Sequence, residues 1–229
     1  MKITFLGTGT SQGVPVIACN CAVCQSTDPK DNRLRSSVLI ESAHTSVIID
    51  AGPDFRQQLL REKVKKLDAI LLTHEHKDHI GGLDDIRSFN FITKKAMSIY
   101  SLSRVHERIK EEFSYVFAEH KYPGIPDMKL HKIDDQIFNI NDIQIIPLKV
   151  LHHRLPVLAF RIDDFAYVTD TNYIPDESVK KLKNLKILVK DVVERLGGST
   201  GGNSVFRLET GFGGGKTHSL IALVHAAVN

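Results

Sequence analysis

The chain has 229 residues, of which 42% are hydrophobic, so it can form one sizeable domain with a core and is too short for two ordinary domains. Thirty Lys and Arg face 27 Asp and Glu, a net charge of +3. The two signs are interspersed, so charge alone predicts no surface for a polyanion such as nucleic acid.

No stretch approaches the roughly 20 consecutive apolar residues that a membrane span needs. The start, MKITFLGTGTSQG, has one lysine and only a brief apolar run before its glycines. We therefore expect a cytoplasmic protein that does not cross a membrane.

The first third of the chain predicts three strands, a helix and a fourth strand. Residues 2–7, 36–42 and 45–52 are short apolar stretches bounded by Gly, Ser and Asp, which is typical of strands. A helix is predicted over residues 53–64, where Pro stands just ahead of an acidic residue. Residues 67–73 are an almost unbroken apolar run, which indicates a central strand buried on both faces.

The remaining elements alternate between the two types. Helices are predicted over residues 80–90, 103–117 and 175–184. Strands are predicted over residues 97–101, 143–150, 157–162, 165–169 and 185–189. Strand pairs that alternate with helices favour an α/β fold in which two sheets pack on each other with helices outside.

The fourth predicted strand ends in a loop crowded with ligand-type side chains, in the sequence LLTHEHKDHIGG. His74 and His76, two residues apart on an extended loop, can bind one ion, and Asp78 with His79 can bind a second. Imidazole and carboxylate ligands suit zinc, manganese or iron. Two such ions about 3.5 to 4 Å apart could share a hydroxide that attacks a phosphoryl or carbonyl centre. A solvated loop with chance histidines is the alternative.

All three cysteines fall in the six residues CNCAVC, as Cys19, Cys21 and Cys24. Their odd number and close spacing argue against a disulfide framework and favour a metal site in a reduced compartment. A loop with small buried residues is the alternative.

These motifs resemble the metallo-β-lactamase superfamily, whose hallmark is the His-x-His-x-Asp-His loop. The resemblance covers residues 1–189. The segments GTGTSQGVP and CNCAVC near the start, and HHRLPVLAF ahead of VTDTN, are similar to the phosphoribosyl cyclic phosphate phosphodiesterases and their bacterial relatives. The resemblance implies a four-layer αββα sandwich, here with an atypical or truncated C-terminal part.

The resemblance also implies the ligands of two divalent ions, Zn or Mn. One ion would be held by His74, His76, His152 and Asp170, and its neighbour by Asp78, His79 and Asp170. Asp78 and Asp170 would be the catalytic carboxylates.

Two assignments need separate arguments. His152 rather than His153 is the predicted ligand because the family pattern places a leucine three residues after it, where Leu155 stands. Asp50 ends a strand, and the resemblance implies that it supports the histidine loop by hydrogen bonds, although a plain turn residue is the alternative.

The cysteines correspond in this resemblance to three thiolates of a structural zinc site. Tetrahedral zinc needs a fourth ligand. In the family that ligand is a histidine near the C-terminus, and a further C-terminal histidine completes the second active-site ion.

Residues 190–229 do not match the family. The stretch LETGFGGGKTH instead resembles a Walker A segment of an unrelated ATPase, which predicts a strand, a loop over residues 211–216 and a following helix. Too little chain follows for a nucleotide-binding fold, so we do not expect an ATPase. The sequence thus predicts an incomplete domain over residues 1–189 and an atypical tail, produced by fusion, truncation or an assembly error. His218 and His225 are candidate substitutes for the absent ligands.

The function implied is that of a metal-dependent hydrolase, with a phosphodiesterase of small cyclic phosphodiesters acting through a metal-bridging hydroxide as the first choice. A tRNA 3′-end-processing nuclease and a lactonase or thioesterase of the same fold are alternatives within the class. A catalytically impaired metal-binding domain is the alternative outside it. The expected partner is a small molecule rather than nucleic acid or a membrane, and a homodimer is compatible with the resemblance.

Overall fold

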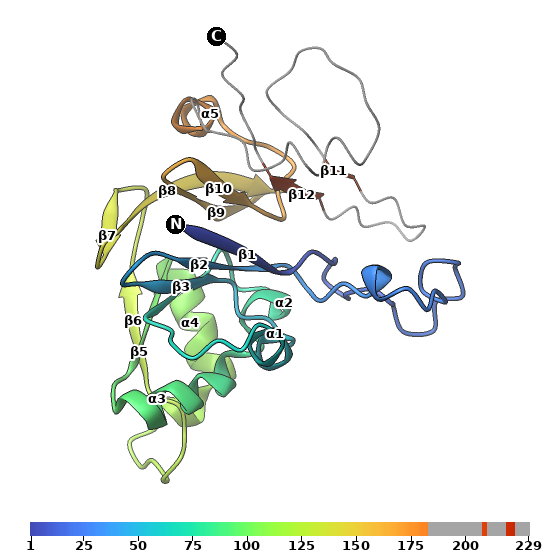
Figure 1. The fold of residues 1–229 in the computed structure, drawn as a ribbon. Coiled ribbons are helices and arrows are strands. Elements are labelled where there is room, and N and C mark those ends of the chain that lie inside the picture. The colour runs from blue at the N-terminus through green and yellow to red at the C-terminus, as the bar shows by residue number, and fades with distance from the viewer. Residues whose placement is uncertain (183–207, 210–218, 223–229) are drawn as a thin grey trace. The chain divides into compact units, whose positions relative to one another are not determined.

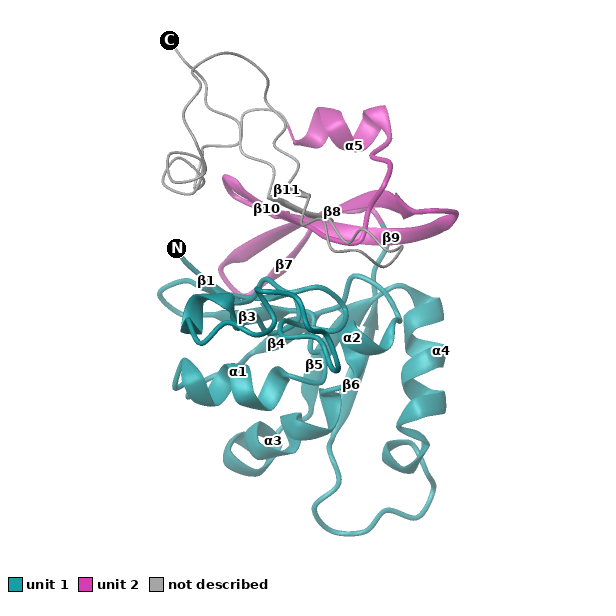
Figure 2. Ribbon diagram, turned by 90° about the vertical axis from the view of Figure 1, so that its right-hand side faces the viewer, with its two compact units in different colours: residues 1–134 teal, residues 135–229 magenta. Residues whose placement is uncertain are grey.

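The computed structural model describes residues 1–182, 208–209 and 219–222 (Figure 1). The chain divides into two compact units, residues 1–134 and residues 135–229, which Figure 2 shows in different colours. Each unit contains one sheet of six strands, and each is described by itself.

The strands of unit 1 follow one another in sequence order across the sheet. They are β1 (Lys2–Gly7), β2 (Ser37–Glu41), β3 (Ser46–Ile49), β4 (Ala69–Leu71), β5 (Met97–Ser101) and β6 (Met128–Lys132). The first three pair antiparallel, and β3 to β6 pair parallel. The strands predicted before residue 102 are all present, and β4 is fully buried as its apolar sequence predicts.

Helices connect the parallel strands of unit 1. They are α1 (Phe55–Arg61), α2 (Lys77–Ile80), α3 (Arg87–Thr93) and α4 (Ser103–Glu112), with the short 3-10 turns η2 (Leu83–Ile86) and η3 (Ser114–Val116). A further 3-10 turn, η1 (Pro29–Asp31), lies between the antiparallel strands β1 and β2. The single helix predicted over residues 80–90 is therefore divided among α2, η2 and α3. Helix α4 is amphipathic, and its buried face contributes Val105 and Ile109 to the core of the unit.

Unit 2 contains a sheet in the order β11-β12-β10-β9-β8-β7, in which all pairs are antiparallel. Its elements are β7 (Phe138–Ile140), β8 (Ile143–His152), β9 (Leu155–Ile162), β10 (Phe165–Val168), α5 (Asp176–Lys181), β11 (Leu208–Glu209) and β12 (Ser219–Ala222). The predicted meander of β8, β9 and β10 is confirmed, and its apolar side packs with Leu182 in one cluster.

Two strands and one segment differ from the sequence prediction. Strands β6 and β7 were not predicted, because β7 has only three residues and β6 contains two lysines and a histidine among its five. Residues 219–222 form strand β12, paired with β10, where the Walker-type pattern predicts a helix. The predicted strand over residues 185–189, the predicted loop over 211–216 and the change at residue 190 lie outside the described residues.

The two sheets with their helices confirm the predicted α/β class. Within the described residues, no helix combines the length and the apolar character that crossing a bilayer requires.

Candidate metal centre

The centre of unit 1 begins where the parallel strands β3 and β4 end. Asp50 directly follows β3, and Thr73 and His74 follow β4, so the parallel pairing brings their side chains to the same edge of the sheet. The Asp50 amide donates to the Leu71 carbonyl at 2.9 Å. Asp50 has a positive φ of 64°, which aspartate tolerates better than most residues and which turns its side chain at the strand end.

The carboxylate of Asp50 is the hub of a buried hydrogen-bond network. It accepts from the Thr73 amide at 2.9 Å, from the Thr73 hydroxyl at 2.9 Å and from His79 Nδ1 at 2.7 Å. Asp50 and Thr73 are fully buried and His79 is 2% exposed. Asp50 thus makes hydrogen bonds to the histidine loop, residues 74–79, and to the residue that precedes it.

This network decides which ring nitrogens face a ligand. Because the Thr73 hydroxyl donates to Asp50, it accepts from His74 Nδ1, which lies 3.0 Å away. His79 likewise donates from Nδ1 to Asp50. In both rings the proton is held on Nδ1, and Nε2 carries the lone pair that a metal ion requires.

The donor atoms of the histidine loop form two close pairs. His74 Nε2 lies 2.9 Å from His76 Nδ1, and His79 Nε2 lies 3.4 Å from an Asp78 oxygen. A zinc ion with ligands at about 2.0–2.1 Å holds two of them roughly 3.3 Å apart in tetrahedral geometry. Each pair has the spacing of two ligands on one ion, so the residues present fit divalent metal ions.

Two glycines let the backbone of the turn after β3 approach the histidine loop. A Cβ added at Gly52 would lie 2.0 Å from the Asp78 carbonyl oxygen, and one added at Gly82 would lie 2.1 Å from the Gly52 carbonyl oxygen. The Ala51 amide donates to the His79 carbonyl at 2.8 Å. The backbone of residues 50–52 thus packs directly against the backbone of the histidine loop, and this contact fixes the positions of Asp78 and His79.

In unit 2, the two predicted ligands lie at the ends of β8 and β10, the two strands that flank β9. His152 is the last residue of β8, and Asp170, with φ of 48° and 6% exposure, follows β10. The Leu151 carbonyl accepts hydrogen bonds from the Thr171 hydroxyl and from the Asn172 amide, both at 2.9 Å. These bonds hold the segment that carries Asp170 against the end of β8.

His153 differs from its neighbour His152 in exposure. Its side chain is exposed, whereas His152 is half-buried. The His153 amide donates to the Asn172 side chain at 2.6 Å, and its positive φ of 56° turns the chain into β9.

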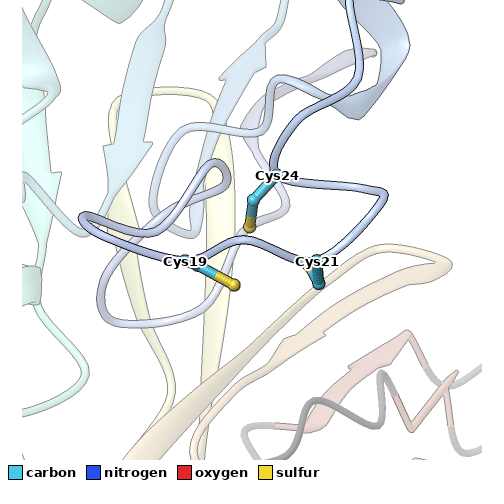
Figure 3. A group of neighbouring side chains, drawn as sticks. All are labelled: Cys19, Cys21 and Cys24. Carbon is cyan, nitrogen blue, oxygen red and sulfur yellow. The ribbon is translucent and has the colours of Figure 1, made fainter.

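The cysteine loop, residues 19–24, forms a second candidate centre in unit 1. The sulfur atoms of Cys19, Cys21 and Cys24 all lie within 4.8 Å of one another, and Figure 3 shows the Cys19 and Cys24 side chains pointing into the same space. The Cys24 amide, followed by the Cys19 thiol, lowers the pKa of Cys21. A hydrogen bond from Val16 favours the Cys24 thiolate, but burial and the two neighbouring thiols outweigh it and raise the pKa of Cys24. Three adjacent thiols suit a thiophilic ion such as zinc.

The structure brings the predicted residues together in three groups. The first group is the histidine loop with its support, Asp50, His74, His76, Asp78 and His79. The cysteines form the second group, and the strand ends of unit 2 carry the third. Thr73 was missed by the sequence reasoning, although its place between a buried strand and the first histidine was a usable signal. His218 and His225 lie outside the described residues.

Comparison with known proteins gives a consistent result. A family model described as a beta-lactamase superfamily domain matches residues 45–196. A crystal structure of a diphosphatase from the PhnP family superposes with a TM-score of 0.74 and 40% sequence identity, over 80% of this chain and 70% of that one.

Curated relatives are longer than this chain. It is 42% identical over 190 residues to an octanoyltransferase of Porphyromonas gingivalis, which covers 82% of this chain and 38% of that protein. It is 29% identical over 166 residues to a ribonuclease Z of Nostoc sp., which covers 71% of this chain and 46% of that protein. The chain thus spans less than half the length of each of these two relatives. From the family model and the PhnP-family structure together, the chain belongs to the β-lactamase superfamily, and its two sheets have the α/β metallo-β-lactamase fold.

Proposed function

We propose that this chain is a metal-dependent hydrolase that cleaves small phosphodiesters, with cyclic phosphodiesters of sugars as the first class to test. The observation that carries the proposal is the Asp50 network, which holds protons on Nδ1 of both His74 and His79 and so prepares two ring nitrogens for metal ions. The 40% identity to a PhnP-family diphosphatase supports a phosphorus centre as the target.

The proposed ligand sets follow the sequence assignment. His74, His76, His152 and Asp170 would hold one ion, and Asp78, His79 and Asp170 would hold the other, with zinc or manganese as the metals. When bound, the ions would supply a water nucleophile at neutral pH and neutralise charge that develops on the phosphoryl oxygens. The buried Asp50 and Thr73 would keep the histidine rings in place throughout.

Cys19, Cys21 and Cys24 would hold a structural zinc ion. The support is the convergence of three sulfur atoms on one space, which is the ligand chemistry of structural zinc. This ion would fix the loop that follows β1 and would take no part in hydrolysis.

A nuclease of the ribonuclease Z type is the second candidate, because seven of the similar curated proteins carry that name. The same metal centre could attack the backbone of a tRNA precursor. Against it, the chain has a net charge of only +3 with interspersed signs, whereas binding an RNA backbone favours a basic surface.

The test combines metal content with hydrolysis. Elemental analysis of protein purified without chelators should give close to three metal equivalents per chain. The same protein should hydrolyse bis(p-nitrophenyl) phosphate, and a panel of a ribose cyclic phosphodiester, a dinucleoside diphosphate and a tRNA precursor should separate the substrate classes. Asp170→Asn, which keeps the shape of the side chain, is the matched control, and turnover no higher than this control would exclude the proposed activity.

A further inference from the structure

Helix α4 contacts the histidine loop through side chains that the metal centre does not use. The rings of His74 and His76 meet each other, with His74 Nε2 2.9 Å from His76 Nδ1, whereas the Glu75 side chain between them reaches Arg104 of α4. Lys77, the first residue of α2, also points away from the ligands, toward α4. Glu75 is acidic and Lys77 is basic, and each meets a residue of the opposite charge.

The partners are two residues of α4. Glu75 Oε2 lies 3.3 Å from Arg104, and Lys77 Nζ lies 2.6 Å from Glu112 Oε2. The side chains of Glu112 and Glu75 are only 11% and 22% exposed, so both carboxylates lie in a partly dry environment. Charge pairs in such places matter more than exposed ones, and removal of one member leaves the other desolvated without compensation.

Helix α4 holds Arg104 and Glu112 in fixed positions. Arg104, Arg108 and Glu112 form a row at i, i+4 and i+8 on one side of the helix, and Arg108 binds the second Glu112 oxygen at 3.1 Å. The adjacent side of α4 is anchored in the core by Val105 and Ile109, both fully buried. A charge on this row is therefore held in a fixed place.

We propose that Arg104 and Glu112 are positioning residues for the metal centre, and that α4 sets the metal affinity by holding Glu75 and Lys77 on the side opposite to the ligands. The inference rests on the proposed metal site. The link between these ion pairs and the ligands is direct, because Glu75 lies between His74 and His76 in the chain and Lys77 precedes Asp78. A backbone rotation that released Glu75 or Lys77 would also turn the neighbouring ligand side chains away from the ion.

The test is a titration of metal-free protein with Co²⁺, read by its visible absorption bands. Thiolate-to-cobalt bands in the near ultraviolet report the cysteine loop separately, so the two centres are distinguished in one experiment. Glu112→Gln should weaken binding at the histidine loop about tenfold, in the range seen when groups that orient ligands are lost. Binding at the cysteine loop should be unchanged.

Glu111→Gln is the matched control. Glu111 lies on the same helix, pairs with the same Arg108 at 3.3 Å and is 67% exposed, and among the described residues it forms no ion pair with the histidine loop. Arg104→Gln should weaken cobalt binding as Glu112→Gln does, and Arg104→Lys should restore part of it. In a double-mutant cycle of Lys77→Met and Glu112→Gln, the changes in cobalt affinity of the two single variants should not add up to that of the double variant.

Equal affinities in Glu112→Gln and Glu111→Gln overturn the inference, provided that circular dichroism shows both proteins folded. Because the readout is metal binding without substrate, the result does not depend on the hydrolysis assay. A protein that binds cobalt as described but hydrolyses no phosphodiester would retain the positioning role and lose the proposed function.

Discussion

The histidine loop and the cysteine loop both gather ligand-type residues in unit 1, but they are built differently. The histidine loop is held by buried hydrogen bonds to Asp50 and Thr73, and His74 is fully buried. The cysteines are only half-buried, and the contacts of their loop are short-range, such as Val16 to the Cys24 sulfur at 3.3 Å. Ile17 beside them is 96% exposed. The fold therefore preorganises the first centre, whereas the second would depend on its own ion for its shape.

Removal of Asp50 should have the largest effect. Asp50→Ala leaves the Thr73 amide and His79 Nδ1 without their acceptor, which costs about 2–6 kcal/mol of folding free energy for two buried donors. Metal affinity at the histidine loop should fall about 10- to 100-fold. Urea unfolding and a zinc titration measure the two losses.

The variant Asp50→Asn separates the effect of Asp50 on the His79 tautomer from its effect on folding stability. The amide keeps the size of the side chain, but its NH₂ group facing His79 favours the other tautomer, with the proton on Nε2. We expect most of the stability to return while metal affinity stays low. Full recovery of affinity in this variant would contradict the tautomer argument.

Gly52 tests the backbone packing behind the same loop. Gly52→Ala places a Cβ 2.0 Å from the Asp78 carbonyl oxygen and should lower the free energy of unfolding by about 1–3 kcal/mol, together with metal affinity. Gly124→Ala is the comparison, because it has a φ of 91° and open space, and should cost about 1 kcal/mol with no change in metal binding. Thermal and urea unfolding of the two variants measure the difference.

The cluster of candidate ligand residues is visible in the sequence, whereas the contacts that orient it are not. His74, His76, Asp78 and His79 stand out because their spacing behind a buried strand is local information. Thr73 was missed because its role depends on Asp50, which reaches it only when β3 and β4 pair. Contacts across the sheet depend on tertiary structure and leave little trace in local patterns.

The same limit applied to the secondary structure. The apolar run of β4 predicted its burial, whereas β6 has three polar residues and one buried residue among five, so its sequence gave only a weak signal. Residues 219–222 are apolar enough for either a helix or a strand, and the pairing with β10 decided the outcome. Helix α4 was predicted from its amphipathic pattern, but its ion pairs with the histidine loop were not.

Metal removal should sharpen the contrast between the two loops. In hydrogen–deuterium exchange, chelation should raise the exchange rate of residues 16–25 on the order of tenfold, because the partners of those amides within the described part of the chain are local. Residues 74–79 should change less, since Asp50 and the α4 ion pairs remain. An equal increase in both loops would show that neither is preorganised.

The smallest expected effect concerns a histidine outside both centres. His106 lies on the buried face of α4, where burial, followed by the charge of Lys110, lowers its pKa below the ordinary value. A lowered pKa in the folded state means that the unfolded chain takes up the proton first as the pH falls. Stability from this group is complete above about pH 6.5, the unfolded value, and is lost as the pH drops through the folded value.

His106→Gln should therefore flatten the decline of unfolding free energy between pH 7.5 and pH 5, measured by urea titration of metal-free protein. The pKa of His131, on neighbouring β6, is lowered by burial and then by Lys129, so a further His131→Gln change should flatten the curve again. Parallel curves for the wild type and both variants would mean that the acid sensitivity of unit 1 arises elsewhere.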